Sequence, residues 1–243
     1  LVLGIGVNQY RLYEQGEVPS VSNGRMIRSI MNPKVMLEMV ESSKNELGES
    51  EYNRIKSKVN GTITEIYAYK LEQYVVRRIF NERRGAANGY AQASLDRLKN
   101  IMLYILNKCG DVWCTKMNKL LFYVDFLSYR DRGMAMTGLV YRAIDFGPVP
   151  DRWERVYSEF AEVKQELHQA GEFVGSKLKA LEDVDVSLFS DEELKVLDAV
   201  CSCFGSMSSR EISRVSHEED AWINHHEKHE LIPFSDSYTI RAI

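Results

Sequence analysis

Residues 115–150, TKMNKLLFYVDFLSYRDRGMAMTGLVYRAIDFGPVP, form the densest apolar and aromatic stretch of the chain. Apolar side chains recur there at helical spacing, and aromatic side chains cover the flanking directions. These two sets are Leu120, Leu121, Val124 and Leu127, and Phe122, Tyr123, Phe126 and Tyr129. A helix that is apolar on nearly every face must be wrapped by other elements. The pattern therefore predicts a central, buried helix.

The ends of this stretch carry their own signals. Thr115 is a suitable N-cap, and Gly133 follows the cationic turn that a helix end prefers. Residues 137–144 then have β character, and the Gly-Pro-Val-Pro corner at 147–150 fixes backbone angles and withholds amide donors. We expect a buried helix that leads into a short strand or β-hairpin.

The same stretch resembles the signature of the Panacea domain, also called the SocA-like antitoxin domain, and later residues resemble its second block. The motifs are Lys116, Lys119 to Tyr123, Phe126, Thr137-Gly138, Tyr141, Ala143, Gly147 to Pro150, Ser208 to Ile212, Ser216 to Glu219, and Trp222. They occur in the family's order over most of residues 90–243. Elsewhere this part of the chain is expected to be mainly α.

The resemblance implies a bacterial antitoxin that neutralises a toxin encoded beside it. Neutralisation would occur by direct masking or by delivery of the toxin to a Clp-type protease. A few aromatic and arginine anchors in an apolar patch would supply the affinity. The candidate toxin-binding residues, each with core packing as its alternative role, are Tyr141, Arg142, Phe146, Trp153 and Trp222.

The opening of the chain resembles the turn and recognition helix of an Xre/Cro-type helix-turn-helix, in an architecture like that of MqsA-type antitoxins. Gly4 supplies the small residue of the tight turn and Ile5 the apolar plug, while Gly6 is a weaker cap than Ser or Thr. The first two helices of such a motif would precede Leu1, so we expect an incomplete DNA-binding domain.

In such a motif the N-terminal side chains of the second helix face the bases in the major groove. Asn and Gln can contact adenine in a bidentate manner, and Arg can contact guanine or a phosphate. The alternative is a short amphipathic helix that ends at Gly16. The candidate DNA-binding residues are Val7, Asn8, Gln9, Arg11 and Gln15, with Tyr10 packed behind them.

Three segments are expected. Residues 1–60 would form the DNA-binding domain, 61–89 a connecting helix and linker, and 90–243 the Panacea-like domain. Asn32 followed by Pro33 predicts a helix start. A break is expected at Asn60-Gly61, before a helix over 64–83.

The Panacea-like segment should contain a helix over 94–108, a helix that continues from Trp153 to Phe160, and a disordered loop around 171–175. Two S-x-x-E capping boxes, at Ser190 and Ser208, predict further helix starts. The expected fold is therefore mainly α, with one short β-hairpin.

The composition is typical of a globular protein, with 44% hydrophobic residues, 27% charged residues and a net charge of −4. Residues 1–85 hold 13 Lys+Arg against 10 Asp+Glu, whereas the remainder holds 18 against 25. Only the first third therefore has the charge to face phosphate. No apolar run is long enough for a membrane span, and four irregularly spaced cysteines predict reduced thiols. We expect a cytoplasmic protein.

The histidine-rich segment 217–229 raises the possibility of a metal site or a hydrolase. A zincin needs a second His four residues after the first, and that position is Ala221. A hydrolase that uses His217 and Glu218 is the weakest alternative. We expect no enzyme, metal or cofactor, because the sequence offers no catalytic motif.

The leading hypothesis is an antitoxin and transcriptional regulator that binds operator DNA as a homodimer through its first part and a cognate toxin through its second. The alternative is a phage-associated interaction module or proteolytic adaptor without DNA binding.

Overall fold

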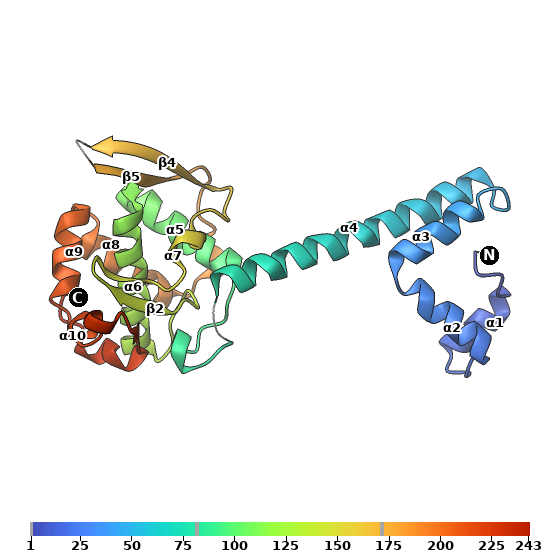
Figure 1. Ribbon diagram of the computed structural model, residues 1–243, viewed down its shortest axis with the longest axis horizontal. Coiled ribbons are helices and arrows are strands. Elements are labelled where there is room, and N and C mark those ends of the chain that lie inside the picture. Colours follow the sequence, from blue (N-terminus) through green and yellow to red (C-terminus); the bar gives the residue numbers. More distant parts are fainter. Residues whose placement is uncertain (1, 81–82, 171–172) are drawn as a thin grey trace. The chain divides into compact units, whose positions relative to one another are not determined.

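The structure, a computed structural model, describes residues 2–80, 83–170 and 173–243. The chain divides into two compact units, a first unit of residues 1–73 and a second unit of residues 74–243. Each is described by itself below, and Figure 1 shows their elements coloured along the chain.

The first unit is helical and has a small core. Its helices are α1 (Val7–Glu14), α2 (Val21–Ile30), α3 (Pro33–Ser42) and the larger part of α4 (Glu49–Ile79). As expected, α3 begins after Asn32, whose side chain accepts a hydrogen bond from the amide of Lys34 at 3.1 Å. Its core consists of the buried side chains Val40, Leu47 and Tyr52.

The expected break at Asn60-Gly61 is wrong, because α4 runs through it. Glycine costs about 1 kcal/mol relative to alanine inside a helix, which is too little to interrupt good helix formers on both sides. Side-chain hydroxyls also bond back to the helix here: Thr62 donates to the carbonyl oxygen of Lys58 and Thr64 to that of Asn60.

The second unit contains the remaining elements. They are η1 (Ala86–Asn88), α5 (Leu95–Cys109), β1 (Val112–Trp113), α6 (Cys114–Arg132), β2 (Tyr141–Ile144), β3 (Gly147–Pro150), α7 (Trp153–Val156), β4 (Val163–Ala170), β5 (Phe173–Ala180), η2 (Val186–Leu188), α8 (Asp191–Phe204), α9 (Ser209–His217), α10 (Asp220–Ile223), η3 (His226–Lys228), β6 (Leu231–Ile232) and η4 (Phe234–Thr239). The fold is mainly α, as the sequence predicts.

Helix α6 is the centre of the second unit, and Figure 1 shows it among the other helices. It packs against α5, α8, α9, β3, β5 and η4, and its residues 116–128 are all buried. It ends at Gly133, whose φ of 73° lies in the left-handed region that favours glycine. Its start differs from the expectation: the N-cap is Trp113, and Thr115 lies inside the first turn.

Two small antiparallel sheets flank the helices. One has the order β3-β2-β6 and contains the expected hairpin, with Tyr141 opposite Pro150. The other has the order β1-β5-β4, so the expectation of a single β element is wrong. Residues 173–175 of the predicted disordered loop belong instead to β5, and residues 171–172 lie outside the described residues.

The helix expected from Trp153 to Phe160 is also shorter than predicted. Only the single turn α7 is helical, and the chain then continues toward β4. Val156, Tyr157 and Phe160 are nevertheless buried in the main core. The spacing therefore identified core residues correctly but overestimated the length of the helix.

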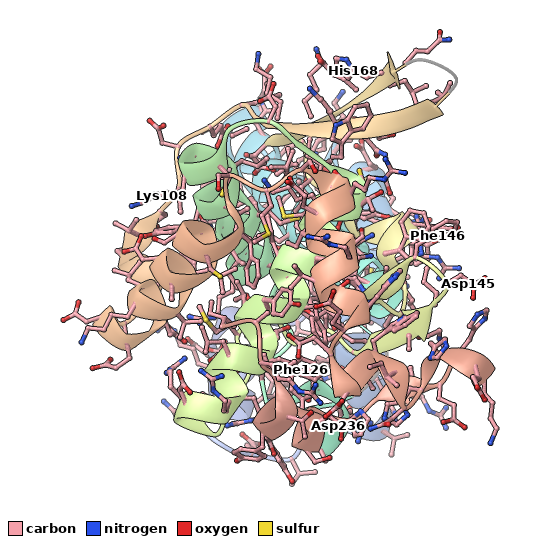
Figure 2. The ribbon with its side chains drawn as sticks, turned by 90° about the vertical axis from the view of Figure 1, so that its left-hand side faces the viewer. Lys108, Phe126, Asp145, Phe146, His168 and Asp236 are labelled. Atoms are coloured by element: carbon pink, nitrogen blue, oxygen red, sulfur yellow. The ribbon has the colours of Figure 1, made fainter. Side chains whose placement is uncertain are left out.

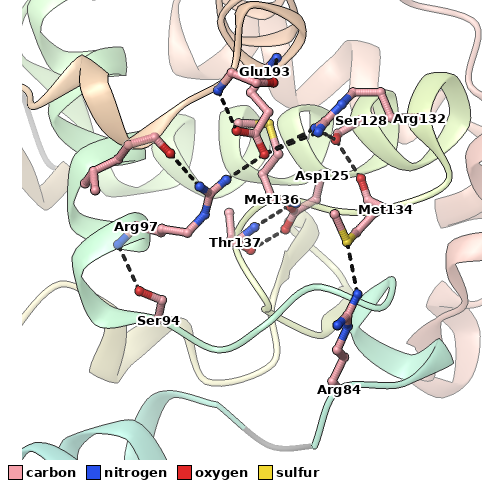
Figure 3. A network of polar contacts seen from close by, with 12 residues as sticks. Arg84, Ser94, Arg97, Asp125, Ser128, Arg132, Met134, Met136, Thr137 and Glu193 are labelled. Carbon is pink, nitrogen blue, oxygen red and sulfur yellow. Dashed lines mark hydrogen bonds and ion pairs between the residues drawn. The ribbon is translucent and has the colours of Figure 1, made fainter.

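A buried polar network holds the loop after α6 in place (Figure 3). The carboxylate of Asp125 accepts hydrogen bonds from the amides of Met136 (2.7 Å) and Thr137 (2.8 Å) and from the hydroxyls of Thr137 and Tyr141. Burial raises the pKa of Asp125, and these four donors act in the opposite direction. The loop is thereby fixed to the middle of α6.

Two further carboxylates connect separate elements. Glu193 accepts from Arg97 at 2.7 Å and pairs with Arg132 at 3.4 Å, which joins α8 to α5 and α6 (Figure 3). Glu219 is buried and accepts from the hydroxyl of Tyr123 and from the amides of residues 241 and 242.

Both predicted capping boxes are confirmed, with Ser190 paired to Glu193 and Ser208 to Glu211. The four cysteines are free thiols in the described structure. None of the helices formed by the described residues combines the length and apolar character that crossing a bilayer requires.

Candidate functional site

A groove of about 620 Å³ opens in the second unit, and we call it the α6–α9 groove. It lies between the first turns of α6 and α9, the β2–β3 turn, and strands β1 and β5. Its lining residues are Asp111, Val112, Trp113, Thr115, Lys116, Phe146, Lys177, Met207, Ser208, Ser209, Arg210 and Ser213.

The groove has an apolar surface as well as polar groups. Phe146 is 73% exposed on the β2–β3 turn, beside Asp145 (Figure 2). The turn is possible because Gly147 has a φ of 98°, which other residues rarely adopt. Trp113 and Met207 supply further apolar area, whereas Val112 lines the groove but is almost fully buried. Exposed aromatic area in a concave site is typical of binding surfaces.

Charge in the groove is mostly positive. The described lining residues include three cations, Lys116, Lys177 and Arg210, against the single acid Asp111. The ammonium of Lys116 donates to the carbonyl oxygen of Gly205 at 2.7 Å, and burial lowers its pKa. The ammonium of Lys177 lies 5.3 Å from the ring centre of Trp113. The groove therefore favours an anionic ligand over a cationic one.

Two helices begin at this groove. The N-cap of α6, Trp113, makes no side-chain cap hydrogen bond, so the first amides of α6 lack that partner. At α9 the capping box satisfies part of the first turn, but the buried hydroxyl of Ser209 has no hydrogen-bond partner among the described residues. Both features leave hydrogen-bonding capacity at the wall of the groove.

A buried amine lies on α6, one turn beyond the residues that line the groove. Lys119, one turn after Thr115 and Lys116 on α6, is fully buried, and its ammonium has no hydrogen-bond partner in the described part of the chain. Burial lowers the pKa of Lys119 to about 7. A Cβ atom added to Gly147 would lie 2.8 Å from Cε of Lys119 and 3.2 Å from Nε2 of His217, so these side chains converge on that glycine.

The five candidate toxin-binding residues fall in different environments. Phe146 lines the groove and is the most exposed of them. Tyr141 is fully buried, and its hydroxyl bonds to Asp125 and to the carbonyl oxygen of Leu121, so its side chain is part of the core.

Arg142, Trp153 and Trp222 are half-buried. The guanidinium of Arg142 pairs with Asp151 at 2.5 Å and donates to the carbonyl oxygen of His229 at 2.6 Å. Trp153 and Trp222 pack against the core, and the indole N–H of Trp222 donates to the carbonyl oxygen of Ile144 at 2.8 Å. The structure therefore does not gather the five residues into one patch.

The candidate DNA-binding residues lie together on α1 and at its end. Asn8, Arg11 and Gln15 are exposed, and Gln9 is half-exposed. The side chain of Val7 lies outside the described residues. Exposure leaves these polar side chains available to a duplex.

The histidine-rich segment has structural contacts. Trp222 stacks between the rings of His217 and His226, at centroid distances of 4.2 and 4.1 Å. His225 contacts Asp236 at 2.9 Å and His229 contacts Asp145 at 2.8 Å. Burial lowers the pKa of His217. Within the described residues, no group of three or more His, Cys, Asp or Glu side chains is arranged to hold a metal ion.

Sequence reasoning missed Lys119, Lys177, Ser209 and Arg210 as site residues. Lys119 could have been noticed, because a lysine within a run of apolar residues on a central helix must lose its hydration. Lys177 could not, because it lies in a polar segment in which no strand was predicted. Ser209 and Arg210 are placed only by the packing of α9 beside α6.

Comparison with known proteins gives one family match. Residues 117–223 match the family described as antitoxin SocA-like, Panacea domain. No curated protein and no solved structure matches the chain. The resemblance to the Panacea domain is thus confirmed for residues 117–223, whereas the helix-turn-helix and the MqsA-like architecture stay predictions. The matched segment begins within α6, at Met117, and includes β2, β3, α8 and α9. The chain therefore carries a region similar to the SocA-like antitoxin domain, and this region supplies seven of the twelve residues that line the groove.

Proposed function

We propose that this chain is an antitoxin of a toxin-antitoxin system, which neutralises a cognate toxin through its second unit. The match of residues 117–223 to the SocA-like Panacea domain carries this proposal. The groove is consistent with it, because the matched segment supplies apolar and cationic side chains that line the groove, namely Phe146, Met207, Lys177 and Arg210.

The same proposal gives the first unit a regulatory role, with α1 reading operator DNA as part of a homodimer. Its support is the exposure of Asn8, Arg11 and Gln15 on one short helix. Amide side chains suit adenine edges, and an exposed guanidinium suits guanine or phosphate. Two copies would place two such helices on the half-sites of a palindrome.

The toxin-binding role is tested by co-expression with the gene that lies beside this one. Induction of that neighbour alone should stop growth, and co-expression of this chain should restore colony counts by at least about 100-fold, because a bound toxin is removed from its target. Repeating the assay in a strain without Clp proteases separates masking, which persists there, from proteolytic delivery, which does not. Absence of rescue in both strains would contradict the antitoxin proposal.

The DNA-binding role is tested by titrating the operon's own promoter fragment with the natural full-length protein. The Arg11→Ala variant is expected to bind about 10-fold more weakly, since one bidentate base contact contributes about 1–3 kcal/mol. Affinity should fall steeply with salt. Arg54→Ala, which removes an exposed Arg from α4, is the matched control. No salt-dependent complex at any salt concentration would favour the alternative of an interaction module without DNA binding.

A further inference from the structure

The α6–α9 groove combines features that point to one kind of occupant. We propose that it receives an acidic segment of the toxin, in which carboxylates flank an apolar or aromatic side chain. This inference rests on the proposed antitoxin function and adds to it the surface that binds and the chemistry of what is bound.

The first argument is the free positive charge at the rim. Neither Lys177 nor Arg210 has an ion-pair partner among the described residues. Glu166 stands opposite Lys177 in the sheet, but its carboxylate pairs with Lys164 at 2.6 Å. The second unit is acidic as a whole, with 22 Lys+Arg against 26 Asp+Glu. A cationic groove favours a partner of negative charge over one of positive charge.

The second argument is unused hydrogen-bonding capacity inside the groove. The hydroxyl of Ser209 is buried without a partner, and the first turn of α6 lacks a side-chain cap. A carboxylate accepts hydrogen bonds from hydroxyls and helix-terminal amides, and the α6 dipole favours its charge. Such a ligand would satisfy groups that are costly to leave unpaired.

The third argument is Lys119 behind the wall. It is fully buried on the same side of α6 as Thr115 and Lys116, and no carboxylate among the described residues pairs with it. The side chains of Ser216 and His217 lie close to Lys119 beside Gly147, and neither can carry a negative charge. An uncompensated buried amine adds positive potential, whenever it is protonated, at the site where an anionic side chain would dock.

The apolar lining decides between an acidic peptide and a simple anion. Phe146, Trp113 and Met207 offer an apolar area that a phosphate or sulfate ion does not cover. A volume of about 620 Å³ holds several side chains. A peptide with an apolar anchor between carboxylates covers both the apolar lining and the cationic rim.

The test compares two charge-reversal variants of the full chain in binding to the purified neighbouring toxin. Lys177→Glu combined with Arg210→Glu removes both rim cations. Lys195→Glu combined with Lys228→Glu makes the same change in net charge at exposed positions outside the groove. We expect the groove variant to bind at least about 30-fold more weakly and the control within about 3-fold of the unchanged chain. Equal loss in both variants, or no loss in either, would overturn the proposal while leaving rescue by the unchanged chain, and so the antitoxin function, intact.

A second measurement does not depend on the toxin. Acetylated and amidated hexapeptides, with two glutamates around one tryptophan, are titrated into the isotope-labelled chain, and their glutamine versions serve as controls. We expect amide shifts in residues 113–116 and 208–213, with the glutamate peptides at least about 10-fold stronger. The proposal is overturned by equal binding of both peptide sets, by shifts elsewhere, by stronger binding of inorganic phosphate, or by self-association through the groove in sedimentation.

Discussion

Replacement of Asp125 by alanine should lower the free energy of unfolding of the second unit by about 4 kcal/mol. The change would leave the amides of Met136 and Thr137 and the hydroxyl of Thr137 without an acceptor in the core. Tyr141 would keep its bond to the carbonyl oxygen of Leu121. Each unsatisfied buried group costs about 1–3 kcal/mol, so the summed effect exceeds that of most single substitutions.

Urea denaturation followed by tryptophan fluorescence measures this effect in the full chain. All three tryptophans, Trp113, Trp153 and Trp222, belong to the second unit and therefore report its unfolding. Asp131→Ala, at an exposed position near the end of α6, should change stability by no more than about 0.5 kcal/mol. Asp125→Asn should fall between the two, because its amide oxygen still accepts. A loss for Asp125→Ala as small as that for Asp131→Ala would show that the loop is held by other contacts.

Replacement of Lys119 by methionine should have the opposite effect and raise the free energy of unfolding by about 3 kcal/mol at pH 7. The native state buries this amine fully and gives it no hydrogen-bond partner among the described residues, and its pKa falls from 10.5 to about 7. Methionine has a similar length and no charge to desolvate. The wild-type residue therefore destabilises the isolated unit.

The pH dependence of this gain follows from the lowered pKa. Below about pH 7 the amine of Lys119 is protonated in both states, and the native state carries that charge in its interior, so the full penalty is present. As the pH rises from about 7 toward 10.5, the unfolded chain also loses its proton and the penalty disappears. The stability difference between Lys119→Met and the unchanged chain should therefore shrink over that range.

Urea titrations of both proteins at pH 7 and pH 9.5 test this prediction, because titrations of other groups cancel in the difference. The exposed Lys195→Met serves as a control and should change stability little at either pH. A gain that stays constant with pH would mean that Lys119 remains hydrated or paired in solution. A loss of stability would mean that its amine makes a favourable contact.

The central part of the fold could be predicted because its signals are local. The apolar run of α6, the glycine at its end and the prolines after β2 each dictate backbone geometry without reference to distant residues. The capping boxes at Ser190 and Ser208 act within one helical turn. These are the features that were confirmed.

Other elements depend on contacts that sequence patterns do not encode. Strands β4 and β5 are mostly polar, and among their side chains of described burial only Val163 and Leu178 are buried, so they lack the alternation that predicts a strand. Helix α4 continues through Gly61 because the cost of one glycine is outweighed by its neighbours.

The candidate site was only partly predictable for the same reason. Phe146 follows from an aromatic residue in a tight turn, and the structure places it in the groove. Tyr141 is also an aromatic residue of this hairpin, but its side chain is buried and its hydroxyl bonds to Asp125. Arg210 and Lys177 come from segments far apart in sequence, which are brought together only by the packing of α9 and β5 around α6.

The carboxylate of Glu219 has a consequence for how the chain tolerates shortening. Two of its three donors are the amides of Arg241 and Ala242, and the third is the hydroxyl of Tyr123. Deleting those two residues would leave the buried carboxylate of Glu219 with the hydroxyl of Tyr123 as its one remaining donor among those three. Trimming there would therefore act like an interior substitution and not like the removal of a loose tail.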